Sequence, residues 1–325
     1  MNYLAEGRAP SFLRPFLAGG VSIALAKNKT AIRPLCCGDP LRRIVAKCFC
    51  IIGKTDIAKV FEGKNYGVGC KGGVEVVAHS LRDMLQRHSD SNLALLKIDF
   101  KNAFNLVDRG AFMKASCETL PNWTNWCYGK RWVLLYDHKH VIWSTAGVQQ
   151  GDPLGPLYFC FALLSLVDEI AALRPLYHKW YLDDGGIIAD VETLKKVWTI
   201  LVEKGPKLGL NLNPNKCEWS WLRASRTDPC PINELLREGE RISSVPTDEI
   251  CMLGVPLGSA QKNGEFVARK LFDRLEKVIF QSRDGKTPSQ RSISCGSRSA
   301  LFGPLTLCGL PLSHTGRSTA RGLTR

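Results

Sequence analysis

The chain has 325 residues, 45% of them hydrophobic, which is enough for a large buried core divided between two subdomains. Its formal net charge of +14 suits a polyanionic partner. Thirteen cysteines without a C-x-x-C pair favour a reducing compartment over a disulfide framework or a zinc site. With no run of about 18 apolar residues and no signal peptide pattern, we expect an intracellular protein, nuclear or cytoplasmic, that is not secreted and contacts no membrane.

The first predicted elements follow residues 1–25, which have no sustained periodicity. Residues 74–88 place apolar side chains on one stripe and predict an amphipathic helix. Residues 93–100 predict a buried strand with Asp99 near its C-terminal end. A helix is expected from about Arg109, and residues 141–144 are a candidate strand.

The central elements follow a loop bounded by Gly and Pro at residues 151–156. Residues 157–172 are apolar on nearly all sides and predict a buried helix. Within residues 180–189, Asp184-Gly185 predicts a hairpin turn that exposes Asp183 and Asp184 at its tip.

The last periodic segment covers residues 194–202 and predicts a helix that ends at Gly205-Pro206. Beyond about residue 285 the sequence is rich in Ser, Gly, Thr and Arg. Residues 286–325 contain six Lys or Arg and no Asp or Glu, so we expect a basic, disordered tail.

Three carboxylates carry the strongest chemical signal: Asp99, and the pair Asp183 and Asp184. Adjacent aspartates between apolar strand residues repel each other, and bound divalent cations relieve that repulsion. Three carboxylates can hold two Mg²⁺ ions about 3.5–4 Å apart, with Mn²⁺ as a possible substitute, at the attacking and leaving oxygens of a phosphoryl transfer. A nucleic-acid polymerase requires such a site.

Residues 97–105, Lys-Ile-Asp-Phe-Lys-Asn-Ala-Phe-Asn, resemble motif A of the reverse transcriptases, most closely the polymerase domain of non-LTR retrotransposons. The resemblance covers roughly residues 20–260 and rests on five motifs in the family's order. It implies that Asp99 is a metal ligand and that the carbonyl of Phe100 supplies a further oxygen. It also implies that Phe104 is an aromatic gate that favours dNTP over rNTP. Asn105 stands where many relatives carry a second aspartate.

The next two matches lie downstream. Residues 147–156 resemble motif B, which implies that Gln150 and Gly151 contact the nucleotide and template. A glycine permits close backbone approach, and a helix N-terminus favours phosphate. Tyr181-Leu182-Asp183-Asp184 is the third match, with Asp183 placed 84 residues after Asp99. The resemblance implies Asp183 as a metal ligand and Asp184 as the second carboxylate.

The remaining two matches are weaker. Residues 209–218 resemble motif D, which implies that Lys216 protonates or neutralises the leaving pyrophosphate. Residues 253–258 resemble motif E, a hairpin that grips the primer end.

A fingers signature at residues 31–35 implies that Arg33 contacts the triphosphate through its guanidinium, with Lys27 or Lys29 as its partner. The basic residues that follow are expected to contact the template backbone or to be solvated: Arg42, Arg43 and Lys47.

Each feature also has a simpler structural interpretation when taken alone. Asp99 could be a strand-end aspartate, Phe104 a core residue, Asp152 a helix cap and Lys216 an exposed loop lysine. Two other functions compete with the main one: an RNA-dependent RNA polymerase, and a catalytically impaired remnant that only binds nucleic acid. Phe104 and the loop at residues 149–151 argue against the first. For the second, the three carboxylates favour activity, whereas the missing thumb argues for poor processivity or none.

The predicted architecture is an α+β fold: a right-hand polymerase palm, in which helices pack on an antiparallel sheet, with partial fingers. Residues 1–95 are expected to form partial fingers and their connection to the palm, and residues 96–260 the palm. Residues 261–285 would be a short connector or thumb remnant, with the thumb truncated or absent. We find no endonuclease or ribonuclease H pattern.

The predicted reaction is the two-metal transfer of dNMP from dNTP to a primer 3′-hydroxyl. The implied cofactor is Mg²⁺, and the implied partners are an RNA template, a DNA primer and dNTP.

Overall fold

The computed structural model describes residues 2–26, 32–116, 120–136 and 140–283. Two compact units make up the chain, Met1–Glu265 and Phe266–Arg325. The predicted basic tail at residues 286–325, together with Lys27 and Lys29, lies outside the described residues.

A five-stranded sheet forms the centre of the first unit, in the order β6-β7-β3-β8-β9. Its strands are β3 (Ala94–Ile98), β6 (Tyr177–Tyr181), β7 (Asp184–Ala189), β8 (Glu218–Trp221) and β9 (Ser243–Ser244). Neighbouring strands are antiparallel except β8 and β9, which pair in parallel. The antiparallel palm sheet predicted from the sequence is therefore present, with one short parallel strand added at its edge.

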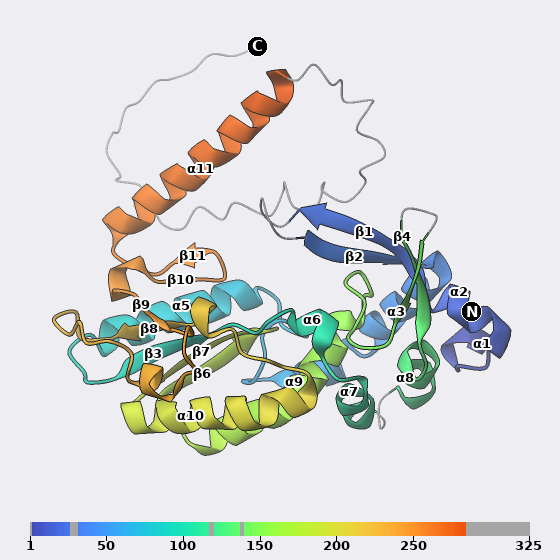
Figure 1. Ribbon diagram of the computed structural model, residues 1–325, viewed down its shortest axis with the longest axis horizontal. Helices are drawn as coiled ribbons and strands as arrows, with labels where there is room; N and C mark the ends of the chain where they lie inside the picture. The colour runs from blue at the N-terminus through green and yellow to red at the C-terminus, as the bar shows by residue number, and fades with distance from the viewer. Residues whose placement is uncertain (1, 27–31, 117–119, 137–139, 284–325) are drawn as a thin grey trace, which may run out of the picture. The chain divides into compact units, whose positions relative to one another are not determined.

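Helices cover both faces of this sheet (Figure 1). Alternate residues of a strand point to opposite faces. Leu95 and Ile188 belong to the core beneath α5 (Gly73–Arg87), whereas Leu96 and Ile187 belong to the core shared with α9 (Gly155–Ala172) and α10 (Val191–Lys204). Burial on both faces explains why β3 is apolar except at Lys97.

A second sheet of four strands has the order β2-β1-β4-β5. It contains β1 (Gly20–Ala26), β2 (Ile32–Gly38), β4 (Trp132–Tyr136) and β5 (His140–Ser144). Strands β1 and β4 pair in parallel, so the N-terminal hairpin joins a hairpin more than 100 residues later in the chain. The predicted strand at residues 141–144 is one of its edge strands.

The remaining elements are shorter. The helices are α1 (Asn2–Ala5), α2 (Arg14–Leu17), α3 (Pro40–Ile52), α4 (Lys54–Phe61), α6 (Ala103–Leu106), α7 (Arg109–Ala115) and α8 (Pro121–Tyr128). A separate hairpin joins β10 (Cys251–Met252) to β11 (Val255–Pro256), and its turn and second strand fall in the predicted motif E.

The segment after residue 260 is more regular than we expected. Where we predicted a short connector or thumb remnant, a helix of 24 residues, α11, spans Ala260–Arg283. Val267, Leu271 and Leu275 recur every four residues along it, the spacing of a helical stripe that our sequence analysis overlooked. The boundary between the two units falls within this helix.

Among the described helices, α9 is long and apolar enough over its 18-residue window to cross a membrane by length and composition alone, although Asp168 and Glu169 interrupt its apolar run. Within the structure 61% of that window is buried, including Phe159, Leu163 and Leu166. A central core helix explains the same composition.

Candidate active site

Asp99 lies where β3 meets its neighbour β7. Strand β3 ends at Ile98, which pairs with Gly185, so Asp99 and Asp184 flank this pair on adjacent antiparallel strands. Leu95, Leu96 and Ile98 are buried and hold the strand in the core, while Asp99 is half-buried at its end. The fold thus brings together acidic residues that are far apart in the sequence.

The hairpin between β6 and β7 turns two residues earlier than we predicted. Tyr181 pairs with Asp184, which leaves Leu182 and Asp183 as the two turn residues. Leu182 has a φ of 54° and Asp183 does not have a positive φ, which is the pattern of a type II′ turn. Asp183 is therefore at the tip, and Asp184 is the first residue of β7.

Gly185, which we took as a turn signal, has a packing role instead. It pairs with Trp180 on β6, and a Cβ at this position would lie 2.5 Å from the Trp180 ring. The ring therefore crosses directly over the glycine, and any side chain would displace it.

A residue that our sequence analysis missed, Asn65, supports the turn. Its side-chain oxygen accepts hydrogen bonds from the amides of Leu182 and Gly67, each at 3.0 Å. Its Nδ2 donates to the Leu182 carbonyl at 3.0 Å, and the amide of Tyr66 donates to the Trp180 carbonyl at 2.8 Å. Asn65 is 3% exposed, so these bonds are shielded from water.

Most of the predicted site residues share one cavity of about 840 Å³. Seven of the nine line it: Asp99, Phe100, Phe104, Gln150, Gly151, Asp183 and Lys216. Asp184 lines an adjacent cavity of about 440 Å³ together with Lys97, and Asp183 lines both cavities. The side chain of Arg33 lies outside the described residues, but its neighbours Pro34 and Leu35 line the larger cavity.

The electrostatics around Asp184 reflect unbalanced negative charge. Burial, followed by the neighbouring charges of Asp183 and Asp99, raises the pKa of Asp184 to about 6. Lys97 opposes this shift. The ammonium of Lys97 is also engaged by Glu218 at 3.0 Å and by the Cys251 carbonyl at 2.9 Å, so it compensates Asp184 only in part.

The donor set suits a divalent cation. Carboxylate and carbonyl oxygens are the ligands that Mg²⁺ prefers, and the strand ends supply Asp99, Asp183 and Asp184 with the Phe100 carbonyl. In the described part of the chain, no three His, Cys, Asp or Glu side chains already form a closed metal cage. The residues fit the ions by the chemistry of their oxygens and by lining the two neighbouring cavities.

Asn213 is a second residue that sequence analysis missed. Its Nδ2 donates to Oδ1 of Asp99 at 3.1 Å, and its backbone amide donates to the Asp99 carbonyl at 2.9 Å. Asn213 precedes the short 3₁₀ turn Pro214–Lys216, so the motif D segment presents Lys216 to the cavity and orients Asp99. An asparagine three residues before the predicted lysine was the available signal.

The opposite wall of the cavity joins motifs A and B. The Phe104 ring stacks on Phe159 of α9, with centroids 4.6 Å apart and planes inclined by 14°. Gln150 Nε2 donates to Asn105 Oδ1 at 3.3 Å. Gly151 has a φ of 134°, and a Cβ on it would lie 2.3 Å from the Cys36 carbonyl oxygen, so only glycine fits there.

Three other polar residues have structural contacts. Asp108 caps α7, because its Oδ1 accepts from the Ala111 amide at 2.8 Å. Arg42 corrects our expectation of a solvated or template-contacting residue: it is 1% exposed and paired with Asp152. Asp152 also accepts from the Leu154 amide at 3.0 Å just before α9, so its cap-like role is combined with an ion pair.

Known proteins resemble this chain over the same region. Residues 26–257 match the family described as reverse transcriptase (RNA-dependent DNA polymerase). The retrotransposable element SLACS 132 kDa protein of Trypanosoma brucei gambiense is 29% identical over 218 residues, covering 59% of this chain. The chain spans only 18% of that relative's length.

Two solved telomerase structures from Candida tropicalis are also similar. The telomerase in complex with the TWJ fragment of telomeric RNA has a TM-score of 0.50 at 12% identity and covers 74% of this chain and 43% of its own. The apo telomerase truncated from its C-terminal domain has a TM-score of 0.46 at 15% identity and covers 62% of this chain and 50% of its own. At 12% identity the likeness to the first of these structures concerns the fold alone. The family match over residues 26–257, together with a palm sheet that joins the predicted motifs, places the chain in the reverse transcriptase family.

Proposed function

We propose that this chain is the core of an RNA-directed DNA polymerase that transfers dNMP from a dNTP to a primer 3′-hydroxyl on an RNA template. The observation that carries the proposal is the meeting of Asp99 and Asp183, 84 residues apart in sequence, in one cavity. Phe104, Gln150 and Lys216 line that cavity as well. A nucleotide, a metal site and a leaving-group lysine would thus share one space.

The implied cofactor is a pair of Mg²⁺ ions, which Mn²⁺ could replace. Asp99, Asp183, Asp184 and the Phe100 carbonyl would hold them. Bound there, the ions would stabilise the attacking 3′-oxygen of the primer and the leaving pyrophosphate.

The remaining residues position the substrate. Phe104 would exclude a ribose 2′-hydroxyl because its ring is held against Phe159. Gln150 and Gly151 would contact the nucleotide and template from the wall formed by motif B. Lys216, exposed at the cavity, would neutralise or protonate the pyrophosphate. Arg33 would contact the triphosphate through its planar guanidinium.

Template and primer would bind mainly through their phosphates. A net charge of +14 supports this mode, and binding of that kind weakens steeply as salt rises. One of the similar telomerase structures contains an RNA fragment, which is consistent with an RNA template for this chain.

The decisive experiment is primer extension on an RNA template with Mg²⁺ and dNTPs. We expect Asp183→Asn to lower incorporation roughly a thousandfold, because it removes a charge that holds the cations. Asp56→Asn, at an exposed aspartate of α4, is the matched control and should leave incorporation unchanged. Equal incorporation by wild type and Asp183→Asn would refute the catalytic assignment.

The same assay separates the alternatives. An RNA polymerase would incorporate rNTP in preference to dNTP. A nucleic-acid-binding remnant would retain primer–template in a filter-binding assay without extending the primer. The family match favours DNA synthesis over both.

A further inference from the structure

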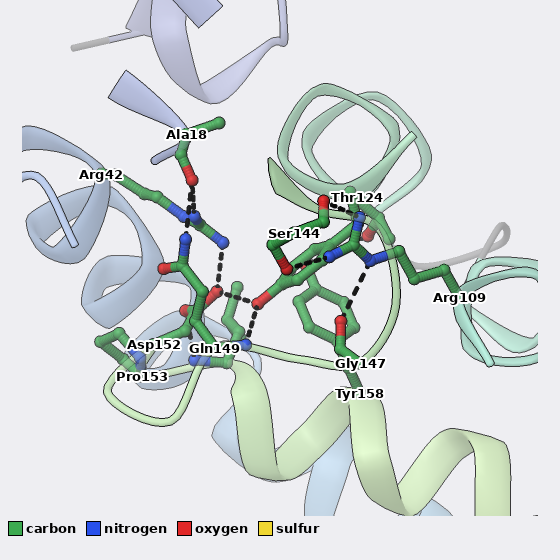
Figure 2. A network of polar contacts seen from close by, with 12 residues as sticks. Ala18, Arg42, Arg109, Thr124, Ser144, Gly147, Gln149, Asp152, Pro153 and Tyr158 are labelled. Atoms are coloured by element: carbon green, nitrogen blue, oxygen red, sulfur yellow. Dashed lines mark hydrogen bonds and ion pairs between the residues drawn. The ribbon is translucent and has the colours of Figure 1, made fainter. Parts of the chain in front are cut away.

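A buried polar network lies between α3 and the loop of residues 147–152, which we call the nucleotide loop (Figure 2). Arg42 on α3 pairs with Asp152 at 2.7 Å between Nη2 and Oδ2, and the two side chains are 1% and 2% exposed. Tyr128 donates its hydroxyl to the same carboxylate oxygen at 2.7 Å. The Tyr128 oxygen in turn accepts from the Gln149 amide at 3.3 Å.

The backbone before β1 joins this network. Arg42 Nη1 donates to the Ala18 carbonyl, and Gln149 Nε2 donates to the same carbonyl at 2.8 Å. The Ala18 carbonyl therefore binds both Arg42, which holds the C-terminal end of the nucleotide loop, and Gln149 within that loop. Arg42 also lies over the Tyr128 ring, with its Cζ 5.0 Å from the centroid.

A second buried arginine grips the other end of the loop (Figure 2). Arg109, on α7, donates to the carbonyls of Gly147 at 3.1 Å, Ala146 at 3.0 Å and Ser144 at 3.1 Å. Its guanidinium also lies over Tyr128 and Trp132, with Cζ 5.6 and 4.6 Å from the ring centroids. Both arginines therefore contact Tyr128.

Between the two anchors, the loop is pressed against the strand of the fingers signature. The Cys36 amide on β2 donates to the Gln150 carbonyl at 2.9 Å, and Gly151 touches the Cys36 carbonyl. The backbone around Gln150 and Gly151, the predicted nucleotide contacts, is thus held by Arg42 at one end of the loop, by Arg109 at the other and by Cys36 between them. Both residues line the cavity.

We propose that Arg42 and Arg109 are positioning residues that clamp the two ends of the nucleotide loop and thereby set the affinity for the incoming dNTP. This inference rests on the proposed polymerase function. The buried Arg42–Asp152 pair is not explained by stability alone, because well-packed apolar residues in its place are often equally stabilising. The pair instead gives the loop one defined geometry, which preorganisation of a binding site requires.

The test removes the clamp without leaving a buried charge unpaired. In the double variant Arg42→Met/Asp152→Leu both charges disappear together, whereas Arg42→Met alone would strand a buried carboxylate. If the double variant does not fold, Arg109→Gln serves instead, because Arg109 bonds backbone carbonyls and the Ser144 hydroxyl and its loss strands no carboxylate. The matched control is Arg87→Met/Asp83→Leu, which removes an Arg–Asp pair from the exposed face of α5.

Two measurements are made on each folded variant: hydrogen exchange of the amides at residues 149–151, and KM and kcat for a dNTP on primer–template. We expect faster exchange in the clamp variants and a KM that rises roughly 10- to 100-fold with little change in kcat. Arg109→Gln should act in the same direction. The control should match wild type in both measurements.

A merely structural role predicts a different result, since partial unfolding lowers the apparent kcat and leaves KM unchanged. An unchanged KM in the folded double variant therefore overturns the clamp while leaving the proposed function intact. A wild-type chain that incorporates no dNTP refutes the proposed function itself, and the clamp's role in dNTP affinity falls with it.

Discussion

Asn213 holds Asp99 through two hydrogen bonds, one from its side chain to the carboxylate at 3.1 Å and one from its backbone amide to the carbonyl at 2.9 Å. The two residues are 114 positions apart in the sequence. A hydrogen-bond donor beside a carboxylate restricts the rotamers that the carboxylate can adopt. Where the carboxylate is a metal ligand, this orients it in advance of the ion.

Replacing Asn213 should therefore impair catalysis more than nucleic-acid binding. We expect Asn213→Ala to lower kcat roughly 10- to 100-fold, the range seen when outer-shell partners are lost. Steady-state primer extension and filter binding measure the two effects. Asn211→Ala, an exposed neighbour in the same segment, is the control. A kcat within error of wild type would show that Asp99 needs no such support.

Asn65 should be important for both stability and activity. Asn65→Ala removes the partners of the Leu182 amide, the Leu182 carbonyl and the Gly67 amide, and we expect a loss of about 1–3 kcal/mol in the free energy of unfolding. Incorporation should also fall, because the turn carries Asp183. Urea titration and primer extension test this, with exposed Asn92→Ala as the control. Unaltered stability would mean that the turn holds its φ of 54° without Asn65.

Phe104 should control sugar selection. We expect Phe104→Ala to lower the preference for dNTP over rNTP, measured as the ratio of kcat/KM values, by about tenfold or more. The physical reason is that the ring cannot shift, because it stacks on Phe159 at 4.6 Å. Phe12→Ala, 72% exposed, should retain the wild-type ratio. The gate assignment fails if Phe104→Ala and wild type discriminate equally.

His178 should make stability depend on pH. Burial lowers the pKa of His178 from 6.5 to about 4, and its neutral Nε2 accepts from the Trp180 Nε1 at 2.6 Å. Because the unfolded chain binds the proton first, the stabilisation is fully present above about pH 6.5 and is lost as pH falls toward about 4. The loss attributable to this residue should reach about 3 kcal/mol once the pH is below about 4.

Urea unfolding of wild type and His178→Gln at about pH 7 and about pH 5 isolates that contribution. Glutamine keeps an acceptor for Trp180 but does not titrate in this range. We expect a flatter pH dependence for the variant. Parallel curves would assign the pH dependence to other groups.

Several parts of the fold could be predicted because local pattern and tertiary environment agree. Buried on both faces, β3 is apolar except at Lys97, and α5 has its stripe on the core side. The Asp184-Gly185 turn was predicted wrongly because glycine serves two purposes: it favours turns, and it also permits close packing, here beneath Trp180. Only the partner strand distinguishes them.

The sequence by itself determined the family, the chemical types of the site residues and their order along the chain. These depend on local spacing, which one strand, turn or loop preserves. Tertiary structure alone decided that Asn213 orients Asp99, that Asn65 supports the Leu182 turn and that Arg42 is buried against Asp152. Each of these contacts joins residues more than 100 positions apart. The neighbouring sequence of a polar residue does not reveal whether water or a buried partner satisfies its hydrogen bonds.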